Sequence, residues 1–132
     1  PEEVRDAALV TGDLGAVAVA ARENRLGDLR LQVFFPVQFM LASPEPDAPS
    51  VLARLSPPVW LEPKYDGIRC QVHKQGRRVG LFSRDLKPLG DVFPELLAGL
   101  SLLPGDWVAD GELVAWQGTR PLPFKDLQRR LG

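Results

Sequence analysis

The sequence predicts an α+β fold in which short helices precede an antiparallel-rich β domain. Near the N-terminus, apolar residues recur at helical spacing, which is typical of helices with one buried face. From Val59 onward, apolar and polar residues alternate, as they do in a strand with one buried face. A turn with a glycine separates two such runs, and this arrangement indicates a β-hairpin.

We expect residues 2–26 to form two short helices. Asp13 is a suitable N-cap for the second, because its carboxylate can accept a hydrogen bond from an unpaired N–H group of the first turn. The residues predicted by their spacing to face a core are Val10, Leu14, Val17 and Ala21. Two short helices bury little apolar surface by themselves, so we interpret residues 1–30 as the end of a larger helical domain.

Residues 43–58 contain five prolines and are predicted to form a linker or an extended surface segment, with one helical turn at residues 50–55.

Ile68, Cys70 and Val72 are expected to face the core of a half-buried strand, and the side chains between them to face water. The expected elements after the linker are a strand-like run at 59–61, a strand at 68–73, a turn at 74–77 that contains Gly76, a strand at 78–83, a helix at 92–102, a strand at 107–116 and a helix that begins at 124.

Length and composition fit one ordinary domain, with 132 residues of which 45% are hydrophobic and 25% charged. No apolar run approaches the roughly 20 residues of a membrane span, and the N-terminus carries no signal segment. Cys70 is the only cysteine, so no internal disulfide is possible, which fits a reducing compartment. Cys70-x-x-His73 lacks a second pair of ligands for zinc. We therefore expect no membrane partner and a cytoplasmic location.

The net charge of −1 argues against a nucleic-acid partner, but the distribution of charge does not. Residues 63–87 hold seven basic residues against two acids, an excess that suits a polyphosphate or a nucleic-acid backbone. A solvated hairpin with a charged outer face explains the same excess equally well. The seven basic residues are Lys64, Arg69, Lys74, Arg77, Arg78, Arg84 and Lys87.

Lys64 is the first candidate for chemistry, because it stands in a K-x-D-G-x-R pattern between two strand-like runs. A lysine attacks only as the neutral amine, whereas an ordinary lysine has a pKa of about 10.4. Nearby cations such as Arg69, Arg84 and a bound magnesium ion would favour the neutral form. Asp66 and Gly67 would shape a tight turn, although K-x-D-G alone is also common in turns without any catalytic role.

Three further motifs each have a structural and a functional interpretation. Arg84 in S-R-D could hold a phosphate or simply pair with Asp85. Glu112 in D-G-E could bind a ribose hydroxyl or a metal, or lie in water on an edge strand. Phe124 could stack on a purine or be a core residue of an amphipathic helix.

The order of the motifs resembles that of the ATP-dependent DNA ligases of cellular and archaeal type, which have an N-terminal helical DNA-binding domain. The resemblance spans nearly the whole chain. It rests on E-P-K-Y-D-G-I-R at 62–69, S-R-D at 83–85, D-G-E at 110–112 and F-K-D-L-Q-R-R at 124–130, and upstream on T-G-D-L-G at 11–15 and P-V-Q-F-M-L-A at 36–42. It implies a nucleotidyltransferase (adenylation) fold that uses ATP and Mg²⁺ and acts on nicked duplex DNA.

The resemblance also implies residue roles. Lys64 would attack the α-phosphate of ATP to form lysyl-AMP, Glu62 would contact the adenine and Phe124 would stack on it. Arg69 would contact ribose or phosphate, and Arg84 would lie near the nucleotide and the nick phosphate. Glu112 would bind ribose and support the metal. A second set of residues would contact DNA, and its members are Arg84, Lys74, Arg77 and Arg78. In this family AMP then passes to a 5′-phosphate at a nick, and a 3′-hydroxyl displaces it.

The family pattern continues with E-G and K-x-K motifs and an OB-fold domain, for which the chain has no counterpart. We therefore expect a truncated chain, inactive or only partly active alone. Residues 1–30 would be the tail of the helical DNA-binding domain, 31–58 a linker and 59–132 the N-terminal half of the adenylation domain. The alternatives are an RNA ligase, a capping-type nucleotidyltransferase, or a non-catalytic module that binds DNA through the basic hairpin at 64–87. In a prokaryote a DNA ligase would be associated with the nucleoid.

Overall fold

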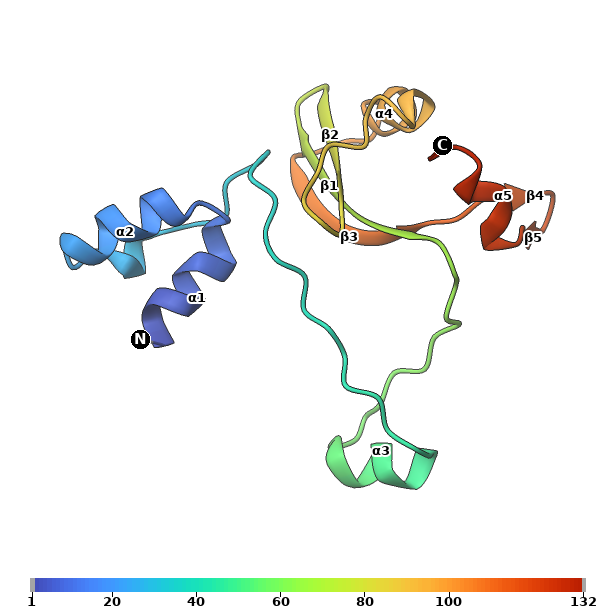
Figure 1. Ribbon diagram of the computed structural model, residues 1–132, viewed down its shortest axis with the longest axis horizontal. Coiled ribbons are helices and arrows are strands. Elements are labelled where there is room, and N and C mark those ends of the chain that lie inside the picture. The colour runs from blue at the N-terminus through green and yellow to red at the C-terminus, as the bar shows by residue number, and fades with distance from the viewer. Residues whose placement is uncertain (1, 132) are drawn as a thin grey trace.

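The computed structural model describes residues 2–131 and confirms the mixed α+β fold (Figure 1). Its N-terminal part consists of α1 (Glu2–Thr11), α2 (Leu14–Arg22) and a 3-10 turn, η1 (Leu26–Asp28). Asp13 caps α2 as predicted, because its Oδ1 accepts a hydrogen bond from the Ala16 N–H at 3.0 Å. The local sequence therefore determines where the second helix begins.

The face that these helices bury differs from the predicted one. Val17 is buried as expected, but Val10, Leu14 and Ala21 are exposed. The buried stripe is rotated around each helix because the helices pack through smaller side chains, which allow closer approach. Its members are Ala7, Thr11, Val17 and Ala20.

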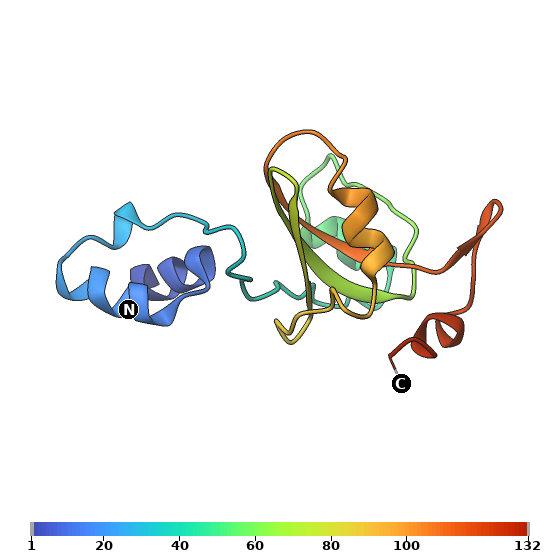
Figure 2. The same cartoon turned by 90° about the horizontal axis from the view of Figure 1, so that it is seen from above.

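An extended chain joins the helical part to the sheet and makes an excursion to α3 (Ala48–Arg54), which lies apart from both (Figures 1 and 2). This helix confirms the predicted helical turn, and Asp47 caps it by accepting from the Ser50 N–H at 2.8 Å. The strand expected at 59–61 does not form. Prolines on either side of it cannot donate to a ladder, and Trp60 and Leu61 are 87% and 94% exposed.

The sheet has three antiparallel strands in the order β2-β1-β3. β1 (Ile68–Gln75) lies in the centre, paired with β2 (Arg78–Ser83) and with β3 (Trp107–Leu113). The predicted hairpin is confirmed, and Gly76 takes the positive φ of 56° that its turn requires. The central strand has a neighbour on each side, so its register fixes which residues of all three strands lie together.

One face of the sheet carries the hydrophobic core. α4 (Pro94–Leu100) and α5 (Phe124–Gln128) supply the covering side chains, and a small hairpin of β4 (Trp116–Gln117) and β5 (Arg120–Pro121) precedes α5. The fully buried members of the core are Cys70, Leu81, Leu89, Phe93 and Leu127. Burial, reinforced by the nearby carboxylates of Asp110 and Glu112, raises the pKa of the Cys70 thiol to about 11. Cys70 is therefore a core residue and stays protonated at neutral pH.

The other face of the sheet is covered as well, which corrects the expectation of a half-buried strand. Gln71 and His73 are buried beneath residues 34–42, an extended segment that we call the strap. The sequence did not indicate this cover, because the strap crosses the face through side-chain contacts and adds no strand to the sheet. Cys70 and His73 consequently lie on opposite faces and cannot share a metal. No helix among residues 2–131 is long and apolar enough to cross a membrane.

Candidate functional site

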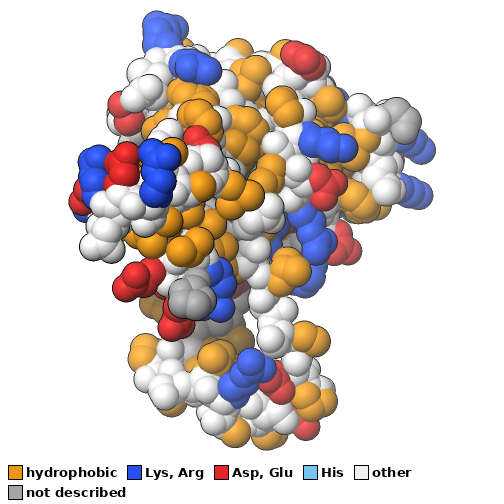
Figure 3. Space-filling view, turned by 60° about the vertical axis from the view of Figure 1, so that its left-hand side comes forward, with side chains coloured by type: hydrophobic (Ala, Val, Ile, Leu, Met, Phe, Trp, Pro, Cys, Tyr) orange, Lys and Arg blue, Asp and Glu red, His pale blue; other side chains and the backbone are white. Residues whose placement is uncertain are grey.

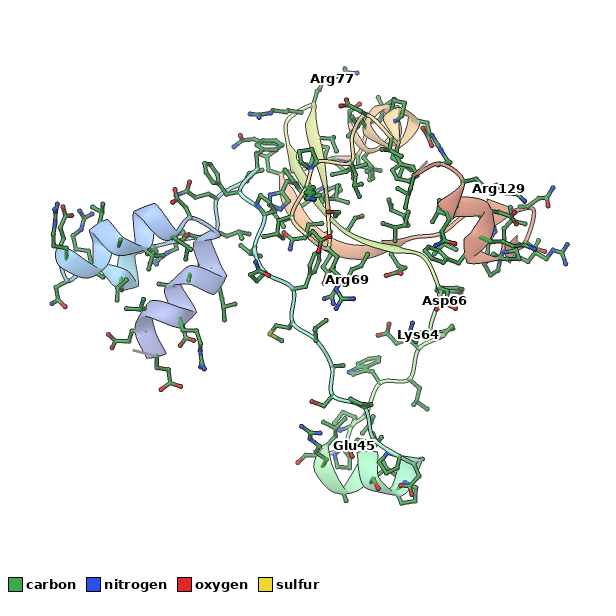
Figure 4. All side chains as sticks on the ribbon, viewed as in Figure 1. Glu45, Lys64, Asp66, Arg69, Arg77 and Arg129 are labelled. Atoms are coloured by element: carbon green, nitrogen blue, oxygen red, sulfur yellow. The ribbon has the colours of Figure 1, made fainter. Side chains whose placement is uncertain are left out.

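Lys64 lies in an extended loop just before β1, and not at the end of a strand. Its side chain is 87% exposed, and its Nζ is 3.4 Å from Asp66 Oδ1 (Figure 4). The loop is held immediately after the lysine, at Tyr65 and Gly67. Tyr65 packs edge-on against Trp116 with ring centroids 6.1 Å apart, and Gly67 lies so close to β3 that a Cβ there would meet the Leu113 carbonyl oxygen at 2.1 Å. The loop is anchored while the amine projects freely.

The strand register brings most of the predicted nucleotide-contacting residues to the same end of the sheet. Arg69 on β1 is the direct cross-strand partner of Glu112 on β3. Arg84 follows Ser83, which pairs with Cys70. Because β1 begins at this end, the Lys64 loop enters the sheet beside these residues. Four residues thus share this end of the sheet, although the first and the last are 48 positions apart in sequence. They are Lys64, Arg69, Arg84 and Glu112.

Arg69 is the most constrained of these side chains. Its Nη2 and Nε donate to the two carboxylate oxygens of Asp110 at 2.7 and 3.2 Å, and its Nη1 donates to the Met40 carbonyl at 2.9 Å. The guanidinium also lies over the Phe39 ring, 4.4 Å from its centroid. The hydrogen bonds with Asp110 raise the pKa of Arg69 further. A guanidinium has five N–H donors, so these three bonds leave two for a ligand.

The basic residues of the hairpin do not form one surface. Arg78 pairs with Gln75 at the far end of β1, about 20 Å from Ile68 at the usual rise per strand residue. Figure 4 shows Arg77 at that far end of the hairpin, well separated from Lys64 and Arg69. Basic side chains are likewise scattered among acidic and hydrophobic ones on the face in Figure 3. The charge excess of residues 63–87 therefore splits into two groups at opposite ends of the sheet.

Lys74 does not fit the predicted DNA-contacting set. It is 2% exposed, and its Nζ donates to the carbonyls of Gly76 and Gly105 at 2.6 and 2.8 Å. A buried ammonium that is bonded to two backbone carbonyls cannot reach a phosphate without breaking the turn. Lys74 instead joins the hairpin turn to the turn before β3. The residues around Lys74 do not indicate this structural role, because Gly105, which supplies the second carbonyl, lies 31 residues further along the chain.

Glu112 and Phe124 have different surroundings. Glu112 is exposed and lines a hollow of about 470 Å³ between the end of β3, α4 and α5. Phe124 is partly buried against the hydrophobic core, as expected for a core residue of an amphipathic helix. No group of three or more His, Cys, Asp or Glu side chains gathers into a metal site within residues 2–131. Glu112 could supply a single carboxylate.

A groove of about 640 Å³ lies between the strap and the sheet, and Arg69 and Asp110 line it together with Phe39 and Met40 of the strap. Lys64, Glu62, Arg84 and Glu112 are not among its lining residues. Lys64, Arg69, Arg84 and Glu112 therefore lie at one end of the sheet without sharing an enclosed pocket. Sequence reasoning missed Asp110, Phe39 and Met40 as the groups that hold Arg69. Only Asp110 carried a signal, as an acid inside an apolar strand.

Comparison with known proteins agrees with these features. Residues 39–131 match the family described as "ATP dependent DNA ligase domain". The chain is 44% identical to a probable DNA ligase of Opitutus terrae, over 99% of the chain and 16% of that protein. It is 40% identical to a probable DNA ligase of Koribacter versatilis, over 98% of the chain and 22% of that protein. With a DNA ligase of Methanospirillum hungatei the identity is 41%, over 98% and 24%.

An α+β chain with an anchored lysine loop beside two arginines and a carboxylate is consistent with a nucleotidyltransferase domain, and the match covers most of the chain. The chain belongs to the ATP-dependent DNA ligase domain family, which confirms the resemblance found in the sequence. It spans about a sixth to a quarter of the length of the curated relatives that it matches.

Proposed function

We propose that this chain supplies the nucleotide-accepting lysine of an ATP-dependent DNA ligase that seals nicks in duplex DNA. The observation that carries this proposal is the position of Lys64, on a loop held against Trp116 and β3 at the end of the sheet that also carries Arg69, Arg84 and Glu112, in a chain of this family. Residues 1–30 would belong to a helical DNA-binding domain, 31–58 to the linker and 59–132 to the adenylation domain.

In the proposed reaction the neutral Lys64 amine attacks the α-phosphate of ATP. An N–P bond forms, the P–O bond to pyrophosphate breaks, and the amine loses its proton to give lysyl-AMP. AMP then moves to the 5′-phosphate at a nick, and the adjacent 3′-hydroxyl displaces it. Most of the catalysis in such transfers comes from positioning and from cations beside the phosphates. At this end of the sheet Arg69 is a cation held in place by Asp110 and Met40, and Arg84 is an exposed one.

The remaining roles follow from the hydrogen-bonding groups that each side chain has free for a ligand. Arg69 offers its two remaining N–H donors to ribose or phosphate, and Arg84, exposed after β2, offers a whole guanidinium fork to a phosphate. Glu62, two residues before Lys64, would contact the adenine. Glu112 would accept a ribose hydroxyl. Phe124 would stack on the adenine from α5, where its side chain is half-buried against the hydrophobic core.

Mg²⁺ commonly binds through one or two carboxylates, phosphate oxygens and water. Glu112 is the one carboxylate that this proposal assigns to it, so the ion would be held mainly by the nucleotide and would offset phosphate charge. The duplex partner would meet Arg84 near the lysine and Arg77 and Arg78 at the far end of the hairpin. As a ligase, the protein would work beside the DNA in the cytoplasm, with the nucleoid in a prokaryote.

The test is covalent labelling of the complete gene product that contains these residues, with α-labelled ATP and Mg²⁺ and a denaturing gel. The wild type and a Lys87→Ala control should carry label, and Lys64→Ala should not. Label from GTP instead of ATP would favour a capping-type enzyme. A protein that carries no label, yet binds duplex DNA in a salt-sensitive way without ATP, would favour the non-catalytic alternative.

A further inference from the structure

The strap (residues 34–42) is held on the sheet by a chain of buried hydrogen bonds from β1. The Gln71 side chain contacts the backbone of Val37 through both its polar groups. Its Oε1 accepts from the Val37 N–H at 3.0 Å, and its Nε2 donates to the Val37 carbonyl. The two residues are 34 positions apart. One side-chain amide thus takes the place of a neighbouring strand for this part of the strap.

His73 extends this network. Its Nδ1 accepts from the Phe34 N–H at 2.8 Å, so that nitrogen carries no proton. Its Nε2 lies 3.1 Å from Gln71 Oε1, which makes Nε2 the donor of a neutral imidazole. His73 is 0% exposed and Gln71 is 3% exposed. If the strap left the sheet, both side chains would exchange these hydrogen bonds for bonds with water, at a modest net cost for each hydrogen bond lost.

The strap also contacts the two parts of the molecule that it connects. Toward the helical part, Gly12 approaches Pro36 so closely that a Cβ on Gly12 would lie 2.5 Å from the Pro36 carbonyl oxygen. Toward the nucleotide end, the Phe39 ring and the Met40 carbonyl hold the guanidinium of Arg69. Val37, fixed by Gln71, lies between these two contacts, and Phe34, fixed by His73, comes just before the first.

We propose that Gln71 and His73 are positioning residues that set the orientation of Arg69 through the strap. They fix the strap at Phe34 and Val37, and the fixed strap presents Phe39 and Met40 to the guanidinium. In calling Arg69 a nucleotide-contacting residue, this inference rests on the proposed function.

The experiment compares Gln71→Met with Gln75→Met in the complete gene product. Methionine is close to glutamine in size but lacks both hydrogen bonds, and Gln75 is an exposed residue of the same strand. In Gln71→Met, the KM for ATP in self-adenylation should rise roughly five- to tenfold, the size of a partly lost charge-assisted hydrogen bond. The rate at saturating ATP should change less than about twofold, since Gln71 does not touch the reacting atoms.

A double-mutant cycle with Arg69→Met separates coupling from simple destabilisation. If Gln71 acts through Arg69, then Gln71→Met should change the KM for ATP less than about twofold in the Arg69→Met background. An effect of the same size in both backgrounds would overturn the proposal. So would an unchanged KM in the Gln71→Met single variant.

Hydrogen exchange gives a measure that does not need ATP. The amides of Phe34 and Val37, which are hydrogen-bonded to His73 and Gln71, should exchange at least about tenfold faster in Gln71→Met, while those of β2 keep their protection, and the NMR resonance of Arg69 Nε–H should shift. Unchanged exchange, or a faster strap with an unmoved Arg69 resonance, would refute the coupling. A wild type that forms no adenylate would refute the proposed function, and exchange and the Arg69 resonance would then decide the coupling alone.

Discussion

Arg69 and Asp110 form a two-point ion pair across the neighbouring strands β1 and β3, with Nη2 to Oδ2 at 2.7 Å and Nε to Oδ1 at 3.2 Å. The pair directs one edge of the guanidinium toward β3 and leaves the other edge toward the strap. Both side chains are partly exposed, so the contribution of the pair to stability is small, whereas its effect on the direction of Arg69 is not.

Asp110→Asn should therefore affect nucleotide binding more than folding. Partly exposed ion pairs contribute at most about 1 kcal/mol, so the free energy of unfolding should fall by no more than that. The KM for ATP in self-adenylation should rise severalfold, because Arg69 loses its carboxylate. Asp85→Asn, at an exposed acid without this contact, is the control. An Asp110→Asn protein with a wild-type KM would contradict the proposed role of the pair.

Lys74→Met should destabilise the fold without weakening the attraction to DNA. Methionine removes the hydrogen bonds that the Lys74 ammonium donates to the Gly76 and Gly105 carbonyls, and a hydrogen bond from a charged group contributes about 1.5–3 kcal/mol. Urea unfolding should show this loss, and Lys87→Met, at an exposed lysine, should stay near the wild type. The salt dependence of duplex binding should be unchanged in Lys74→Met. A reduced salt slope would show that Lys74 contacts phosphate after all.

The pH dependence of stability should report His73, the one histidine of the chain. Burial lowers its pKa from the ordinary value of 6.5. The unfolded chain then binds a proton at a pH where the folded protein does not, so stability is complete above pH 6.5 and falls as the pH drops toward the folded pKa. NMR titration of the imidazole and urea unfolding between pH 7.5 and 5.5 test this. An imidazole pKa at or above 6.5, or a free energy of unfolding that does not change with pH, would contradict the assignment of His73 Nδ1 as a buried hydrogen-bond acceptor.

Gly67→Ala should displace the lysine loop. The new methyl group would overlap the Leu113 carbonyl, at 2.1 Å from its oxygen, and such overpacking typically costs about 1–3 kcal/mol. The rate of adenylate formation should also fall, because the lysine loop can no longer lie against β3. Gly111→Ala is a matched control on the neighbouring strand, with no atom within 4 Å of its Cβ. Full labelling of Gly67→Ala would show that the close approach does not position Lys64.

The local elements could be predicted because local signals determine them. The Asp13 cap, the Gly76 turn and the alternation of β1 were read from neighbouring residues, and the motif order gave the family. Contacts between distant segments could not be predicted. Lys74 looked like a surface residue until its partner carbonyl at Gly105 was known, and the strap has neither alternation nor turn signals that would place it on Gln71 and His73.

The candidate site was predicted only in part for the same reason. The motifs contain Lys64, Arg69, Arg84 and Glu112, and the strand register brings these four to one end of the sheet. Phe124 is half-buried against the core, which suits an aromatic in an amphipathic helix, and its stacking on the adenine stays a prediction. The groups that hold Arg69 come from the strap, whose backbone carbonyl and aromatic ring form no recognisable pattern.

The most direct test of the account is to locate the AMP after labelling the complete gene product with α-labelled ATP and mapping the peptides. The account predicts that the label lies on the peptide that contains Lys64, and that it is released when nicked DNA is added. Label on a different lysine, or a full-length wild-type protein that takes up no label with ATP and Mg²⁺, would contradict it.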